Sequence, residues 1–464
     1  MLVRTPNIES ISGFGIQSNS SHLFPSGCEV HQSSIDILCK FQHLRCISFA
    51  DCKDFRALAA FLTSSASRHC LQVLDITYRL PRSLNYPFNF QPEYAQLRSA
   101  LAGLKLTELN ANSSELLPPG SLDMLNTSAM RILKVGGVWI DPTILIGLIK
   151  GARNLDHLEF SICPCSRAES KCIAQHVDAN RRLLLIISLL DQLMILKVTS
   201  LDCGVTLECE AFCLHMAFHL EEMVRGLGRW GRLMIFGIDD SLHRFGLIKA
   251  IADYLPQLRG LEYGLVSGSD LRYALARLPR LKELKVDLKL CRFDVFSFIH
   301  DHLPRLKSLS VEEKGGSTLE SLIHLIQFPE FKNLRIEGSL FIHSMDAPDL
   351  ANLPDMRLET LEFPGYVRNE DESLAAFLKK CPLLRRLILP ENTTDREMQV
   401  ISKTCHYLEE LRIGHCNQVT ASGIQAVIDG CTKLKVVNST VFAYRANRGQ
   451  LKIGKYRKIS FIYP

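Results

Sequence analysis

The chain has 464 residues, a formal net charge of +5, and 47% hydrophobic and 22% charged residues. These proportions are those of a soluble, folded protein, and the longest apolar run, 183–190, is too short to span a membrane. The N-terminal sequence contains no apolar stretch of a secretory signal. The sixteen cysteines therefore predict free thiols in a reducing compartment, cytoplasmic or nuclear.

One phrase, Leu-x-x-Leu-x-Leu, recurs along almost the whole sequence. Its clear copies begin at Leu44, Leu71, Met130, Leu155, Leu193, Leu258, Leu281, Leu306, Phe331, Leu358, Leu384 and Leu408, and weaker copies begin at Leu106, Trp230 and Leu434. From Trp230 to Leu434 the copies follow one another at intervals of 23 to 28 residues. A phrase of this form with a period of about 20–29 residues is the signature of a leucine-rich repeat.

Each repeat is predicted to consist of a strand followed by a helix. Positions four and six of the phrase are two residues apart, so in a strand they point into the core while the alternate positions point outward. Helical spacing of apolar residues follows the strands at 371–381, 395–405 and 422–431. The sequence signals for helix starts are Asp141 before Pro142, Ser317 with Glu320, and Thr394 with Glu397.

The N-terminal half departs from the regular period. Residues 6–14 are expected to form one more repeat, with Ile8 and Ile11 at phrase positions one and four. The irregular region 77–105 contains an aromatic and proline-rich stretch that we expect to be a surface loop. The irregular region 161–232 begins with a longer predicted helix, and its pattern fits either an insertion or degenerate repeats.

The C-terminal residues 441–464 contain six basic residues and no acidic one, which leaves a net charge of −1 for the 440 residues before them. This near-neutral body argues against a nucleic-acid partner along its length. Within 441–464, alternating apolar and basic residues predict a short strand or hairpin that caps the last repeat. Contact with nucleic acid or acidic lipid, and an unstructured tail, are the alternatives.

The predicted fold class is α/β: a right-handed leucine-rich-repeat solenoid, or horseshoe, with a parallel concave sheet and helices on the convex side. Residues 1–440 are expected to form this solenoid, with about 15 repeats. Residues 441–464 are expected to form the basic C-terminal cap or tail.

A glycine motif at Gly226, Gly228 and Gly231 matches the spacing of dinucleotide-binding loops. A helix-like stretch precedes these glycines and a strand-like stretch follows them, whereas phosphate binding needs a strand first and a helix second. We therefore interpret the motif as a turn between a helix and a strand.

A cysteine cluster could be taken for a metal site. It comprises Cys163, Cys165, Cys172 and His176, with Cys209 and Cys213 nearby. Its first pair is closer together than the C-x2–4-C spacing typical of zinc sites, so buried thiols that behave as small apolar groups are the prediction. Because no catalytic set occurs at a diagnostic spacing either, we predict no enzyme activity, no cofactor and no metal.

The segment 405–437 fits the pattern Cys-x-x-Leu-x-x-Leu-x-Leu-x-x-Cys-x-x-Val/Ile-Thr. The matching residues are Cys405, Leu408, Leu411, Ile413, Cys416, Val419 and Thr420; Cys431 and Leu434 open the next unit, and Cys381 opens the unit before. This segment resembles the cysteine-containing leucine-rich repeat of F-box/LRR proteins. The upstream Pro-x-Leu-x-x-Leu units are similar to looser members of that family, of a kind frequent in fungi.

Members of that family are substrate receptors of cullin-type ubiquitin ligases, in which an F-box docks on the Skp adaptor and the repeats hold the substrate. The resemblance therefore implies a protein substrate or partner, with the Skp adaptor and a cullin as further partners. The chain contains no recognisable F-box, so we expect a truncated form or a repeat-only relative. A repeat scaffold or regulator unconnected with ubiquitin is the alternative.

The partner is expected on the concave face, because the outward strand positions are held in place by the repeat yet free to vary. The candidate partner-binding residues are Glu283, Lys285, Asp287, Glu312, Arg335, Glu337, Glu362, Arg386, Glu410 and Arg412. Arg386 and Arg412 are expected on neighbouring strands, and so are Arg335 and Glu362. Reversing the charge of Arg335 or Arg412 is expected to weaken partner binding without unfolding the chain.

Overall fold

The computed structural model describes residues 10–11, 36, 39–40, 42–49, 55–65, 68–77, 93–112, 122–137, 140–162, 173–200, 207–238, 247–291, 295–313, 328, 330–338, 340–342, 354–364, 367–369, 373–414, 418–439 and 460–462. The chain divides into two compact units: unit 1 ends at Gln257, and the repeats of unit 2 begin at Leu258.

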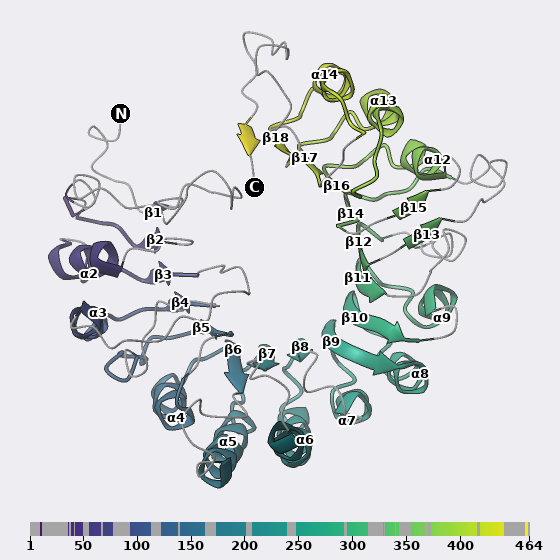
Figure 1. Cartoon of the computed structure of the whole chain (residues 1–464). Coiled ribbons are helices and arrows are strands. Elements are labelled where there is room, and N and C mark those ends of the chain that lie inside the picture. The colour runs from purple at the N-terminus through teal and green to yellow at the C-terminus, as the bar shows by residue number, and fades with distance from the viewer. Residues whose placement is uncertain are drawn as a thin grey trace. The chain divides into compact units, whose positions relative to one another are not determined.

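In unit 1, each strand pairs in parallel with the next one along the chain (Figure 1). The strands are β1 (Ser10–Ile11), β2 (Cys46–Ser48), β3 (Val73–Asp75), β4 (Glu108–Asn110), β5 (Ile132–Val135), β6 (His157–Ile162), β7 (Ile195–Ser200) and β8 (Ile235–Ile238). The helices are α2 (Phe55–Ser64), α3 (Glu93–Leu101), α4 (Pro142–Gly151), α5 (Ile173–Ile187), α6 (Leu207–Gly228) and α7 (Leu247–Tyr254).

Unit 2 continues the same alternation. Its parallel strands are, in order of pairing, β9 (Gly260–Ser267), β10 (Glu283–Leu290), β11 (Ser308–Glu313), β12 (Asn333–Gly338), β14 (Thr360–Glu362), β16 (Arg386–Leu389), β17 (Glu410–Ile413), β18 (Val436–Ser439) and β19 (Ser460–Ile462). The short strands β13 (Leu340–Ile342) and β15 (Val367–Asn369) pair separately, also in parallel. The helices are α8 (Gly268–Leu275), α9 (Val295–His302), α12 (Ser373–Lys379), α13 (Asp395–Thr404) and α14 (Ala421–Gly430).

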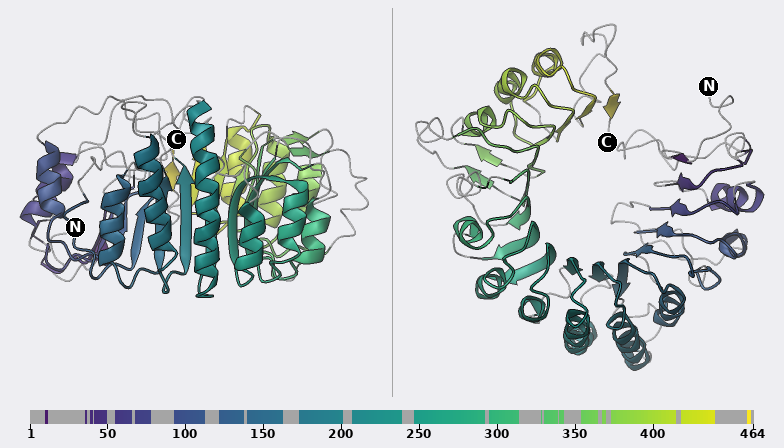
Figure 2. Two further views of the ribbon diagram at one scale, coloured as in Figure 1. Left: turned by 90° about the horizontal axis from the view of Figure 1, so that it is seen from below. Right: turned by 180° about the vertical axis from the view of Figure 1, so that it is seen from behind.

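Within each unit the strands line one side and the helices cover the other, as the two views of Figure 2 show. The predicted α/β repeat fold, with a parallel sheet and helices on one side of it, is confirmed. In the predicted C-terminal cap, β19 lies beside β18 and extends the sheet, while residues 440–459 lie outside the described part of the chain. Among the described residues, none of the helices has the length and apolar character needed to cross a membrane.

One backbone hydrogen-bond pattern sets the register of successive repeats. The carbonyl oxygen at phrase position two accepts from two amides of the following repeat, those at positions two and three. Arg259, for example, accepts from Lys282 and Glu283 at 2.7 and 2.9 Å, and Lys282 accepts in the same way from the next repeat. Shared acceptors of this kind satisfy the backbone where the strands begin. The position-two residues therefore form a row along one edge of each sheet.

The core consists of phrase positions one, four and six. In the repeat that begins at Leu408, the side chains of Leu408, Leu411 and Ile413 are all buried, and the other clear repeats follow the same pattern. Full burial of one such side chain stabilises the fold by about 1.5–3 kcal/mol relative to exposure. Because each strand and helix has only its neighbours to bury this face against, the repeats depend on stacking.

The weak phrase copy at Trp230 is a wrong assignment, displaced by three residues. β8 pairs with β7 so that Phe236 lies opposite Leu196, and the buried residues at positions one, four and six are Leu233, Phe236 and Ile238. Trp230 is 45% exposed, and its indole N–H donates to the carbonyl oxygen of Ser188 at 3.1 Å. Apolar residues occupy both registers between 230 and 238, so spacing alone could not separate them.

Helix starts follow the predicted capping signals where the structure describes them. The Thr394 amide donates to Glu397 Oε2 at 2.8 Å, and the Thr394 hydroxyl accepts from the Arg396 amide, so the capping box is confirmed. Asp141 accepts from the amide of Thr143 at 2.7 Å. The predicted signal at Ser317 lies outside the described residues.

The glycine motif lies between a helix and a strand, as predicted, but Gly226 and Gly228 belong to the last turn of α6 and only Gly231 lies in the connecting turn. α6 ends at Gly228, Gly231 has a positive φ of 63°, and β8 follows. A methyl group on Gly226 would lie 2.7 Å from Ser188 Cβ, and one on Gly228 would lie 2.5 Å from the Tyr254 carbonyl oxygen. These glycines therefore let α6 approach its neighbours closely.

In the irregular region 161–232, β7 keeps the register between β6 and β8, and α5 and α6 take up part of the extra length.

Candidate protein-binding surface

A row of alternating charges crosses the outward positions of β12, β14, β16 and β17. We name this row the ion ladder; its members are Glu337, Arg335, Glu362, Arg386, Glu410 and Arg412. The guanidinium of Arg335 lies 2.9 Å from Glu337 Oε2 and 2.8 Å from Glu362 Oε2. Parallel pairing places Arg335 directly opposite Glu362, which is why the two side chains meet.

Arg386 continues the ion ladder toward the C-terminus. Its Nε atom lies 3.0 Å from Glu362 Oε1 and 3.8 Å from Glu410 Oε2, and Arg412 Nε lies 2.5 Å from Glu410 Oε1. Arg386 Nε is buried without hydrogen-bond geometry to a partner, so its attraction to the two carboxylates is Coulombic. The predicted neighbour pair Arg335 and Glu362 is thus in contact, and Arg386 and Arg412 share Glu410.

Two predicted contact residues are not exposed, contrary to expectation. Glu362 is 8% exposed between its two arginines, and Asp287 is 4% exposed. A register shift in β10 between Val286 and Asp287 accompanies this burial, and Lys289 Nζ lies 2.7 Å from Asp287 Oδ2. Both carboxylates therefore order neighbouring cations and are poorly accessible to a partner.

The remaining predicted residues lie N-terminal to the ion ladder. Glu312 forms an ion pair with Lys289, and Lys285 forms one with Glu262. Burial by itself lowers the pKa of Lys289, but hydrogen bonds and charge from Asp287 and Glu312 outweigh it and raise that pKa. Glu283 is exposed at the start of β10. The neutral Ser310 lies opposite both Lys285 and Arg335, and so separates these pairs from the ion ladder.

Sequence reasoning missed a polar cluster in unit 1. It is formed by Asn112, which lies just after β4, and by His157, Glu159 and Lys197 on β6 and β7. The amide nitrogen of Asn112 donates to Glu159 Oε2 at 2.5 Å, and His157 Nε2 lies 2.8 Å from Glu159 Oε1. Burial raises the pKa of Glu159, but these hydrogen bonds and the charge of Lys197 outweigh it and lower the pKa to about 2. The available signal was that His157, Glu159 and Lys197 occupy outward positions of the clear phrase copies at Leu155 and Leu193.

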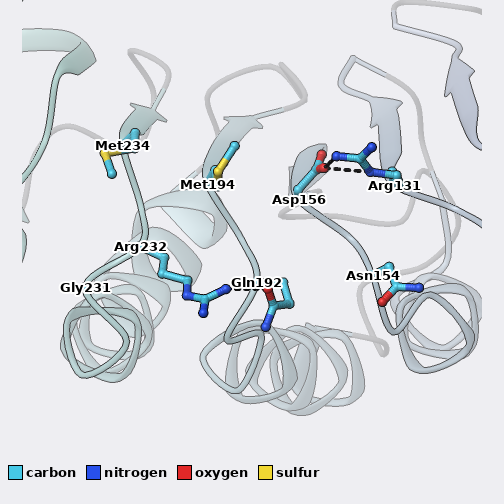
Figure 3. A pocket seen from close by; sticks show the side chains of 8 residues that line it. All are labelled: Arg131, Asn154, Asp156, Gln192, Met194, Gly231, Arg232 and Met234. Carbon is cyan, nitrogen blue, oxygen red and sulfur yellow. Dashed lines mark hydrogen bonds and ion pairs between the residues drawn. The ribbon is translucent and has the colours of Figure 1, made fainter.

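A pocket of about 600 Å³ opens at the edge where the strands of unit 1 begin (Figure 3). It is lined by Arg131, Asn154, Asp156, Gln192, Met194, Gly231, Arg232 and Met234. Arg131 Nε lies 3.0 Å from Asp156 Oδ2, and a guanidinium nitrogen of Arg232 donates to the Gln192 side-chain carbonyl. The pocket is lined by paired polar side chains and by the flexible thioethers of Met194 and Met234. Flexible thioethers of this kind are suited to packing against another surface.

The buried thiols of unit 2 link successive repeats. Cys405 donates to the Cys381 carbonyl at 3.6 Å, and Cys431 donates to the Ile401 carbonyl at 3.7 Å. Burial raises the pKa of Cys405 to about 12, so this thiol is protonated and unreactive at neutral pH. Of the cysteine cluster for which we predicted buried thiols and no metal, 163–172 lies outside the described residues. Within the described part of the chain, no three metal-binding side chains gather at one place.

No protein-family profile matches the chain, and no curated protein shows significant sequence similarity to it. Among solved structures, a chain of the yeast Rad7–Elc1 complex is similar, with 15% identity and a TM-score of 0.46, covering 78% of this chain and 80% of that one. The internalin InlF of Listeria monocytogenes has 13% identity and a TM-score of 0.37, covering 80% and 88%. A leucine-rich-repeat protein of Leptospira interrogans has 13% identity and a TM-score of 0.31, covering 87% and 91%.

These TM-scores are low, so the fold assignment rests on the strand pairing and the repeated burial pattern of the chain itself.

Proposed function

We propose that this chain is a non-enzymatic, protein-binding repeat module whose partner contacts the strand side of unit 2. The ion ladder is the observation that supports the proposal. Its arginines keep 33–40% of their side-chain surface exposed while carboxylates hold them in place. Side chains that are already ordered lose little entropy on binding, and arginine is enriched at protein interfaces.

Within that function, we propose a substrate receptor, or a repeat-only relative of one, in a Skp–cullin–F-box type of ubiquitin ligase pathway in the cytoplasm or nucleus. The support is the cysteine-containing repeat motif. Cys381, Cys405 and Cys431 occupy equivalent buried positions, and Thr420 caps the N-terminus of α14. These structural positions of the motif residues support the proposal. A scaffold or regulator unconnected with ubiquitin is the second candidate.

Affinity purification of the full chain from cells of its source organism, followed by mass spectrometry, tests the pathway. Recovery of the Skp adaptor and a cullin is the outcome expected of a ligase component. Reproducible recovery of another protein without the adaptor or a cullin would contradict the pathway and leave the more general binding function intact.

Charge reversal tests the binding face. Arg412 lies at the end of the ion ladder and contacts Glu410, whereas Arg335 contacts the buried Glu362, so Arg412→Glu disturbs the fold less. We expect Arg412→Glu to weaken capture of the recovered partner by about tenfold. The matched control is Arg396→Glu, an exposed site at the start of α13 on the helix side of the same unit. Equal capture by both variants would exclude the ion ladder from the interface.

A further inference from the structure

Four basic residues gather at the edge where the first strands of unit 2 begin. We name them the basic edge: Arg259, Arg280, Lys282 and Arg305. Arg259 and Lys282 occupy phrase position two and are joined by the shared-carbonyl hydrogen bond of neighbouring repeats. Arg280 and Arg305 each precede a phrase by one residue. The three arginines are exposed and Lys282 is half-buried, so the four charges face solvent along consecutive repeats.

Along the same edge of unit 2, most other charged side chains at phrase position two, or just before a phrase, form ion pairs. Lys307 lies 2.8 Å from Glu330, Lys332 lies 2.6 Å from Glu359, and Glu409 contacts both Arg385 and Lys435. In contrast, the basic edge residues have no ion pair with any residue that the structure describes. The excess of positive charge is therefore local to the repeats of β9, β10 and β11.

The lowered pKa of Glu330 indicates that several of these cations lie near one carboxylate. A hydrogen bond and charge from Lys307 lower the pKa of Glu330, burial opposes the shift slightly, and the charges of Lys282 and Arg305 lower it further. Three cations from two neighbouring repeats thus act on one carboxylate that already has a partner. Their remaining field points to solvent, where it attracts an anionic group.

We propose that the basic edge binds an extended, acidic segment of a protein partner, lying across the starts of β9, β10 and β11. Strands in a sheet are about 4.8 Å apart, and side chains on one side of an extended peptide are about 7 Å apart, so long Arg and Lys side chains can reach successive carboxylates. This inference rests on the proposed protein-binding function and names the chemistry of its partner.

The surroundings favour a peptide over nucleic acid. Glu283 is exposed immediately after Lys282, and Glu330 lies among the cations, so carboxylates interrupt the positive row. A nucleic-acid backbone carries a charge on every unit and would be repelled at these two points. A peptide can place neutral residues opposite them.

The test is fluorescence anisotropy with the full chain and a labelled peptide of about eight glutamates, long enough to cross the three strand starts. The test variant combines Arg280→Gln, Lys282→Gln and Arg305→Gln. The control variant combines Arg385→Gln, Lys433→Gln and Lys435→Gln, which removes the same total charge from the same two kinds of repeat position around the paired carboxylate Glu409. Circular dichroism confirms that both variants are folded.

We expect wild type and the control variant to bind the peptide alike, and the test variant to bind about tenfold more weakly, with binding decreasing as salt increases. An equal loss in both variants would overturn the proposal, since it would indicate general attraction to net charge. Tighter binding of a single-stranded DNA of equal charge, lost in the test variant, would also overturn it in favour of a phosphate backbone.

Partner capture separates this inference from the proposed function. If Arg412→Glu weakens capture while the test variant changes neither capture nor peptide binding, the basic edge fails and the binding module stands. If the peptide binds at the basic edge but neither Arg412→Glu nor the test variant affects the recovered partner, the placement of that partner on unit 2 fails instead.

Discussion

Glu159 and Glu362 lie at outward strand positions, yet their side chains are only 12% and 10% exposed. Removing a carboxylate from water is costly unless cations or hydrogen-bond donors replace the lost hydration. Glu362 receives two arginines, and Glu159 receives His157, Asn112 and the charge of Lys197. The strand pattern predicts that both residues face solvent. In the structure, each carboxylate is instead the centre of a network of hydrogen bonds and ion pairs.

Stability in acid should depend on Glu159. Because its folded pKa of about 2 is below the ordinary value of 4.5, its contribution is present above pH 4.5 and is lost as the pH falls toward 2. The shift corresponds to at most about 3 kcal/mol of unfolding free energy. Urea unfolding at pH 7 and pH 3 should show a smaller loss on acidification in Glu159→Gln than in wild type. Equal losses in the two proteins would contradict this assignment.

At the scale of elements, the long helix α6 depends on close approach to its neighbours. Gly226 faces Ser188 just after α5, and Gly228 faces the backbone of Tyr254 at the end of α7. Glycine is unfavourable in a helix, so its two occurrences near the end of α6 are explained by contact distance.

Substitution of Gly228 by alanine should therefore destabilise the chain, because the added methyl group would lie 2.5 Å from the Tyr254 carbonyl oxygen. We expect a loss of about 1–3 kcal/mol in thermal or urea unfolding. The matched control is Gly147→Ala in α4, where, among the described residues, the added carbon meets nothing within 4 Å beyond its chain neighbours and the backbone of its own helix. That substitution should be neutral or stabilising by up to about 1 kcal/mol. Similar losses in both variants would show that helix packing at Gly228 is not the cause.

At the scale of the whole molecule, the repeats of each unit contact mainly the repeats next to them. Strand pairing joins consecutive strands of the main sheets, and the shared-carbonyl hydrogen bonds also link only adjacent repeats. In such an array the stability is close to a sum of repeat and nearest-neighbour contributions. A local defect should consequently remain local.

Leu411→Ala tests this locality. Leu411 is fully buried at phrase position four of β17, and its truncation should cost about 2–5 kcal/mol. Hydrogen exchange measured by mass spectrometry should show faster exchange in β16, β17 and β18, with unit 1 unchanged. The control Leu383→Ala, at a residue that is 41% exposed, should leave exchange almost unaltered. Acceleration throughout the chain would contradict nearest-neighbour stability.

Sequence patterns predicted the repeat register correctly where it depends only on interactions between residues close together in the chain. The capping box at Thr394 and the buried positions of the Leu408 repeat depend on residues close in the chain, so spacing is sufficient to identify them. The Trp230 assignment failed because two apolar registers overlap within 230–238, and only pairing with β7 distinguishes them. The binding role of the ten candidate residues stays a prediction.

That this protein is an array of strand-helix repeats follows from its sequence, because the phrase fixes which side chains must leave water and each repeat must bury them against the next. Which charged side chains remain available to a partner depends on contacts between neighbouring repeats, which the sequence pattern does not reveal. Parallel register placed Glu362 between Arg335 and Arg386 and left Arg280 and Arg305 without ion-pair partners among the described residues. Those pairings join residues from neighbouring repeats, some 24 to 27 positions apart in the chain, and depend on distances of a few ångströms that periodicity does not encode.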